Sequence, residues 1–192
     1  IRVLQKEKKM AAYQCLEKNI EKNAEQILSA NKLDIENAFA NDLSKPLINR
    51  LKVSEESIAG IIKSISEIKD QPDPIGTILE NWEQPNGLKF SKISVPLGVL
   101  GVIYESRPNV TVDASCLALK SNNALILRGG SDSYHTSKQL VNIITESFME
   151  ANLPENIIQM IPTTDREAVD HLLQMKDYVN VIIPRGGKSL IK

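Results

Sequence analysis

The chain has 192 residues, of which 42% are hydrophobic and 24% are charged, a balance typical of a folded globular protein rather than a disordered one. Its 23 basic and 24 acidic residues give a formal net charge of −1, so charge offers no reason to expect nucleic acid or an anionic membrane as a partner. No apolar run approaches the roughly 20 residues of a membrane span. The first residues, IRVLQKEKKM, lack the apolar core of a signal peptide. Two cysteines, Cys15 and Cys116, lie far apart and favour free thiols in a reducing compartment, so we expect a cytoplasmic protein.

The first seventy residues carry the pattern of several helices. Apolar residues recur at helical spacing over residues 3–30, and Asn31 is expected to end that helix. A second, short helix is expected over residues 34–40. Ser44, followed by Lys-Pro, predicts another helix start, and Ser54 with a serine three residues later predicts one more.

Two short strand-like runs follow the helices, at residues 77–82 and 88–95. The Pro85-Asn86-Gly87 sequence between them is a hairpin signal, because Asn and Gly tolerate positive φ. The second run alternates only roughly, which leaves room for a bulge. The residues alone leave two interpretations open, a hairpin on the domain surface or an arm that binds another subunit.

From residue 96 onward the pattern alternates between strands and helices. Strands are expected at residues 98–103, 124–127, 157–161 and 179–183, with helices at 110–120, 137–151 and 165–175. Such alternation is typical of a parallel, doubly wound α/β sheet with helices on both faces.

Polar turns follow these strands, at the edge where open α/β sheets bind their ligands. Arg107 and Arg128 would place two fixed positive charges there, which suits an anionic ligand. The turn 184–189, PRGGKS, combines two glycines with a helix start, a pattern that can bind phosphate but is equally that of a plain tight turn. Arg128 could instead cap nearby carbonyl groups.

The remaining candidates point to structural roles. His135 and His171 have no second ligand at suitable spacing, so no metal site is expected. Cys116 and Cys15 both lie in helix patterns, and we interpret them as core residues.

Three sequence blocks resemble a known family. YESRPNVTVD, LKSNNALILRGG and IIPRGGKSLI are similar to the gamma-glutamyl phosphate reductases, or glutamate-5-semialdehyde dehydrogenases, of the aldehyde dehydrogenase superfamily. The resemblance implies amino-terminal helices of the cofactor domain over residues 1–74, a hairpin oligomerisation arm over 75–95, and a Rossmann-like domain over 96–192 that is incomplete at its carboxyl end. It also implies a homo-oligomer and contact with glutamate 5-kinase.

The resemblance further implies reduction of gamma-glutamyl phosphate with NADPH, through a cysteine thioester, in proline synthesis. Carried over residue by residue, it implies substrate-binding roles for Ser106, Arg107 and Asn109. It implies cofactor-binding roles for Arg128, Gly129, Gly186, Gly187 and Lys188. An arginine at position 128 favours NADP over NAD, because a guanidinium pairs well with a phosphate.

The nucleophilic cysteine of the family lies beyond the position that matches Lys192, so no catalytic residue is expected in this chain. We therefore expect an amino-terminal piece of the enzyme, such as a recombinant fragment, a proteolytic product or the product of a split gene, and we expect it to be inactive alone. Two alternatives stay open. One is a non-catalytic binding module from a split or decayed gene, and the other is NAD-dependent oxidation of another aldehyde.

Overall fold

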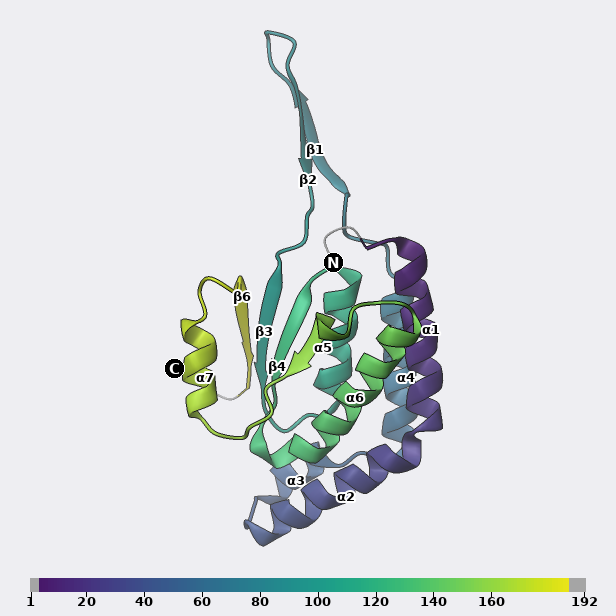
Figure 1. Cartoon of the computed structure of the whole chain (residues 1–192), viewed down its shortest axis with the longest axis vertical. Coiled ribbons are helices and arrows are strands. Elements are labelled where there is room, and N and C mark those ends of the chain that lie inside the picture. Colours follow the sequence, from purple (N-terminus) through teal and green to yellow (C-terminus); the bar gives the residue numbers. More distant parts are fainter. Residues whose placement is uncertain (1–3, 187–192) are drawn as a thin grey trace.

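The computed structural model describes residues 4–186, which form a four-stranded parallel sheet between helical layers, with a two-stranded hairpin projecting from one end (Figure 1). The sheet strands are β3 (Val99–Tyr104), β4 (Ala124–Arg128), β5 (Ile158–Met160) and β6 (Val181–Arg185). The helices that connect them are α5 (Asn109–Lys120), α6 (Tyr134–Glu150) and α7 (Glu167–Gln174). The predicted doubly wound α/β class is confirmed, although β6 begins and ends two residues later than expected.

The strand order is β5-β4-β3-β6, and every neighbouring pair is parallel. The chain first adds β4 and β5 on one side of β3, then crosses to place β6 on the other side. Successive side chains of a strand point to opposite faces of the sheet. Leu100 and Val102 accordingly join the main core beneath α5 and α6, whereas Ile103 packs with Leu172 and Val179 on the α7 side.

Four further helices precede the sheet: α1 (Lys6–Lys22), α2 (Ala24–Ala40), α3 (Lys45–Leu51) and α4 (Glu55–Asp70). Helix α1 packs against α4 and α6, and α4 packs against α5, so these helices form an outer layer over one face of the sheet (Figure 1). The start of α4 is a reciprocal cap, in which Ser54 Oγ accepts from Ser57 N and Ser57 Oγ accepts from Ser54 N, both at 3.2 Å. No helix within residues 4–186 is long and apolar enough to cross a membrane.

The expected break at Asn31 is wrong, because the helix boundary falls at Asn23 instead. Asn31 lies buried within α2, where its side chain donates to Leu51 O and Thr136 Oγ1 and accepts from Val53 N. Asparagine weakens helices when its side chain competes for nearby backbone groups. Here that side chain is engaged by distant partners, so the helix continues through it.

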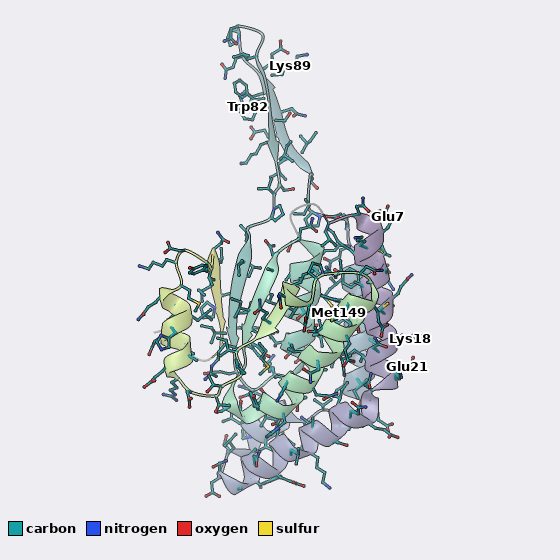
Figure 2. All side chains as sticks on the ribbon, viewed as in Figure 1. Glu7, Lys18, Glu21, Trp82, Lys89 and Met149 are labelled. Carbon is teal, nitrogen blue, oxygen red and sulfur yellow. The ribbon has the colours of Figure 1, made fainter. Side chains whose placement is uncertain are left out.

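The hairpin consists of β1 (Ile78–Glu83) and β2 (Lys89–Ile93), and every residue of both strands is exposed. Figure 2 shows Trp82 and Lys89 well away from the sheet and its helices. The Trp82 and Phe90 rings stack across the two strands, with centroids 5.3 Å apart. The register shifts between Ile78 and Glu80, so the irregularity lies in the first strand rather than in the second, where the sequence left room for a bulge.

Candidate functional site

The carboxyl ends of three sheet strands lie level with one another. Ile103 of β3 pairs with Arg128 of β4, and Tyr104 of β3 pairs with Arg185 at the end of β6. One edge of the sheet therefore carries the turns 105–108 and 129–133 and the start of the turn at Gly186. Because the chain reverses its direction of strand addition between β3 and β6, a crevice is expected outside this pair of strand ends. Two predicted site residues, Gly187 and Lys188, lie outside the described residues.

The turn after β3 holds its serine in an unusual conformation. Ser106 has a φ of +44°, in the left-handed region, and only 6% of its surface is exposed. Its hydroxyl donates a hydrogen bond to the carboxylate of Asp132, which lies in the turn after β4. A left-handed serine persists only when its surroundings hold it there. Asp132 therefore fixes the β3 turn from the neighbouring turn.

Arg107 follows Ser106 and is exposed at the strand-end edge. Asn109 is also exposed and begins α5, where its Nδ2 donates to Asp113 Oδ2 over 3.2 Å. Arg107 and Asn109 thus lie on the open side of the turn, whereas Ser106 lies on its buried side. The structure brings the three predicted substrate residues into one turn but leaves only two of them accessible.

Arg128, at the end of β4, is buried, with 7% of its surface exposed. Its Nη1 donates to Gly129 O at 2.6 Å, and its Nη2 donates to Thr164 O at 2.8 Å and Asp165 O at 3.2 Å. The side chain thereby joins the end of β4 to the loop that follows β5. These contacts are those of the carbonyl-capping alternative, at a buried position rather than on the surface. Within residues 4–186, Nε has no hydrogen-bond partner.

Two glycines leave room for side chains that pack at this edge. A Cβ on Gly130 would overlap Asp132 Oδ1 in the same turn, and a Cβ on Gly129 would lie 3.1 Å from Tyr104 Oη at the end of β3. Both contacts are closer than is usual for a Cβ atom, so a side chain at Gly130 would displace the carboxylate that holds Ser106, and one at Gly129 would press on Tyr104. The predicted site residue Gly129 thus has a packing role at this edge.

Helix α6, which follows the turn after β4, is anchored from a distant helix. Asp34 of α2 is 1% exposed, and its carboxylate accepts from the backbone N–H groups of His135 and Thr136 and from the Thr136 hydroxyl. A carboxylate at a helix start satisfies free N–H groups and interacts well with the helix dipole. Sequence reasoning missed both Asp34 and Asp132. For Asp132, the one signal available in the sequence was its place in the Ser-Asp-Ser run just before a predicted helix.

The two thiols differ in burial, and neither is activated. Cys116 is fully buried, as predicted, and burial raises the pKa of its thiol. Cys15 is only partly buried, so its assignment to the core is wrong; desolvation, followed by the nearby Glu150 carboxylate, raises the pKa of its thiol as well. Both thiols are therefore protonated at neutral pH, whereas a nucleophile requires the thiolate.

The sequence over residues 7–189 matches the family model described as the aldehyde dehydrogenase family. A gamma-glutamyl phosphate reductase of Bartonella bacilliformis is 47% identical over 191 residues, a match that covers 99% of this chain and 46% of that protein. A gamma-glutamyl phosphate reductase of Clostridium tetani is 47% identical over 173 residues, covering 90% of this chain and 40% of that protein. This chain thus spans less than half the length of these curated relatives.

Solved structures agree with the sequence matches. The crystal structure of gamma-glutamyl phosphate reductase from Thermotoga maritima superposes with a TM-score of 0.95 at 36% identity, covering 99% of this chain and 46% of that one. The structure of the Saccharomyces cerevisiae gamma-glutamyl phosphate reductase gives a TM-score of 0.91 at 28% identity, covering 99% and 48%. A probable aldehyde dehydrogenase of Listeria monocytogenes, at 16% identity and a TM-score of 0.73 over 99% of this chain and 39% of that one, shares the fold.

Proposed function

The chain belongs to the aldehyde dehydrogenase family, and we propose that it is the cofactor-binding part of an enzyme that reduces gamma-glutamyl phosphate to glutamate-5-semialdehyde in proline biosynthesis, with NADPH as reductant. One observation carries this proposal. Proteins named gamma-glutamyl phosphate reductase match 99% of the chain at 47% identity. The proposal assigns the whole reaction to the complete protein and a binding role to this segment.

The proposed reaction has two stages. A cysteine thiolate from outside residues 1–192 attacks the acyl carbon. The bond from that carbon to the phosphate oxygen breaks, phosphate departs, and the acyl group remains on the cysteine as a thioester. When bound, NADPH supplies the hydride that reduces the thioester carbon, after which the resulting thiohemiacetal collapses to the aldehyde and the free thiolate. The raised pKa values of both thiols in this segment support an external nucleophile.

The turn after β3 forms the substrate side of the proposed site. The exposed Arg107 guanidinium offers paired donors that match a carboxylate or an acyl phosphate. Ser106 is buried and its hydroxyl bonds to Asp132, so its part is to hold the turn. Asn109 offers an exposed amide beside Arg107.

The ends of β4 and β6, on either side of β3, carry the proposed cofactor contacts. Arg185 and Gly186 are exposed at the end of β6, on the other side of the switch point from Arg107. A cation and a glycine at a strand end fit a dinucleotide, because the cation attracts phosphate and the glycine lets it approach the backbone. We assign Gly187 and Lys188 to the same turn on the resemblance alone. Gly129 and Arg128 shape the end of β4, which lies on the opposite side of β3 from β6.

The assay of the complete reductase decides the function. Glutamate-5-semialdehyde, phosphate and NADP should yield NADPH in the reverse direction, and omission of phosphate should abolish the signal. The chain of 192 residues alone should bind NADPH more tightly than NADH in a fluorescence titration and should show no turnover. A phosphate-independent reaction with NAD would instead support oxidation of an ordinary aldehyde, and turnover by the isolated chain would contradict the external nucleophile.

We also propose that the hairpin is an oligomerisation arm. Its exposed apolar residues, among them Ile78, Trp82 and Phe90, lack partners that bury them within residues 4–186. Such a surface is typical of one that is covered in an assembly. Trp82→Glu should lower the mass of the complete enzyme in sedimentation velocity. Contact with glutamate 5-kinase and a cytoplasmic location stay predictions.

A further inference from the structure

A cavity of about 320 Å³ lies beside the turn after β3, between α4 and the first turn of α5. It falls within the size range of small-molecule sites. Pro108 and Asn109, the two residues that follow Arg107, form one wall, so the cavity borders the strand-end turn. The other walls are formed by α4 and by residues 50–53 at the end of α3.

Asp113 provides a negative charge in this cavity. Its side chain is half-buried, with Oδ1 accepting from Ser64 Oγ at 2.9 Å and Oδ2 accepting from Asn109 Nδ2 at 3.2 Å. An ionised carboxylate has room for about four hydrogen bonds. None of the ion pairs found among residues 4–186 includes Asp113. The carboxylate is therefore held in place by neutral groups and can still accept bonds from a cation.

Positive charge enters the cavity from a different element. Arg50 lies in the last turn of α3 and Lys52 directly follows the helix, and both line the cavity and are exposed. A carboxylate is a natural ligand for these cations, and a guanidinium can hold it through two parallel hydrogen bonds. The cavity therefore offers one anionic group on α5 and two cationic groups at the end of α3.

Gly60 shows that α4 leaves space at this cavity. It lies inside the helix, where glycine is less favourable than alanine because it loses more backbone freedom on folding. A Cβ added at Gly60 would meet no atom within 4 Å, so neighbouring packing does not require a glycine there. Gly60 lines the cavity, and its missing side chain keeps the cavity wide.

We propose that this cavity binds the α-amino-acid end of the substrate, with its ammonium group on Asp113 and its carboxylate on Arg50 and Lys52. The reacting end of the same molecule then lies at the Arg107 turn. This inference rests on the proposed function, and it adds residues that recognise the part of the substrate that does not react. It explains why opposite charges face one cavity and why an interior helix position is left as glycine.

The test compares two aldehydes in the complete reductase, glutamate-5-semialdehyde and 5-oxopentanoate, which has the same carbon chain without the amino group. Asp113→Asn keeps the shape of the side chain and an oxygen that accepts from Ser64, but it removes the charge. It should lower kcat/KM for glutamate-5-semialdehyde about tenfold or more, as expected for the loss of a charge-assisted bond, and leave 5-oxopentanoate nearly unchanged. The KM for NADP should not change.

A second pair of variants tests the space. Gly60→Leu should fill the cavity and raise the KM for both aldehydes, whereas Gly60→Ala should keep most activity and make the fold more resistant to heat. Lys63→Ala is the matched control, because Lys63 lies on the same helix, does not line the cavity and has a side chain that is 78% exposed.

The outcomes separate the two levels of the proposal. If the unaltered enzyme acts on neither aldehyde, the proposed function itself fails. If it acts on both equally well, or if Asp113→Asn lowers kcat/KM for both by the same factor, the enzyme does not recognise the amino group through Asp113, and the inference is overturned. Gly60→Leu with unchanged KM values would likewise show that the substrate does not occupy this cavity.

Discussion

Strands β3 and β4 are neighbours that end at the same level, and an arginine lies near each end: Arg128 is the last residue of β4, and Arg107 lies in the turn after β3. The two side chains nevertheless lie in opposite environments. Arg128 is buried and donates to three backbone carbonyl groups, whereas Arg107 is exposed at the edge. A buried guanidinium whose two terminal nitrogens both donate to backbone carbonyls stabilises the fold. An exposed one in the turn after β3 remains available to a ligand. The same residue type near two neighbouring strand ends therefore has two different roles.

The largest effect should come from Arg128→Ala, measured as the free energy of unfolding of the chain in urea. The variant loses one buried hydrogen bond to Gly129 O and two partly buried ones to Thr164 O and Asp165 O. A hydrogen bond from a charged group contributes about 1.5–3 kcal/mol. We expect a loss of about 3 kcal/mol in total. Arg107→Ala is the matched variant and should change stability by less than about 0.5 kcal/mol. Similar losses of unfolding free energy in both variants would show that the two arginines contribute equally to stability.

Arg107→Lys should have the next largest effect, on activity rather than on stability. Lysine keeps the charge but cannot form two parallel bonds to a carboxylate or phosphate. In the complete reductase we expect kcat/KM for the semialdehyde to fall about 10- to 100-fold, the loss of one charge-assisted pair. Thermal unfolding of the same variant should be unchanged. A lowered unfolding temperature with normal kcat/KM would give Arg107 the structural role instead.

The sequence predicted the strands that carry this edge because apolar runs bounded by glycine or polar turns are local signals. The runs at 98–103 and 124–127 fall within a residue of β3 and β4 at either end. The partners that fix the turns left no such signal. Ser106 and Asp132 lie 26 residues apart, and Asp34 and Thr136 lie 102 residues apart. Roles that depend on contacts between distant segments appear only when the fold brings those segments together.

A smaller effect tests whether the two turns are coupled. Asp132→Ala and Ser106→Ala each remove one end of the hydrogen bond between the turns, and each should cost about 1–1.5 kcal/mol in urea unfolding. Combined in one chain, they should cost less than their sum by about 1 kcal/mol. Asp132→Ala with Asn109→Ala, whose side chain bonds elsewhere, should be additive. Additivity in the first pair would mean that the two turns are held independently.

The smallest effect at neutral pH concerns Tyr104, the last residue of β3, whose hydroxyl lies next to Gly129 in the turn after β4. It is 1% exposed, and its hydroxyl bonds to Thr111 Oγ1 at 2.7 Å, so Tyr104→Phe should cost about 1 kcal/mol at pH 7.

Burial raises the pKa of Tyr104 above its usual value near 10, because the phenolate is poorly solvated in the core. The folded chain therefore keeps a proton that the unfolded chain loses, and stability falls as the pH rises above about 10. Urea unfolding between pH 7 and pH 11 should show a shallower fall for Tyr104→Phe. Tyr13, which also has a raised pKa, contributes equally to both proteins. Parallel curves would show that Tyr104 ionises freely in the folded chain.

The central position of β3 has a consequence for the order in which the protein is made. At its start, Gly98 N donates to Asn123 Oδ1, 25 residues away, and Val99 N donates to Asn180 Oδ1, 81 residues away. Closing the longer loop costs more chain entropy, and a ribosome synthesises residue 180 later than residue 123. Strands β3, β4 and β5 can pair while one edge of β3 still waits for β6. Until residues 181–185 emerge, the nascent chain exposes the strand that will lie in the middle of its sheet. At that stage the exposed edge of β3 is a binding site for a chaperone.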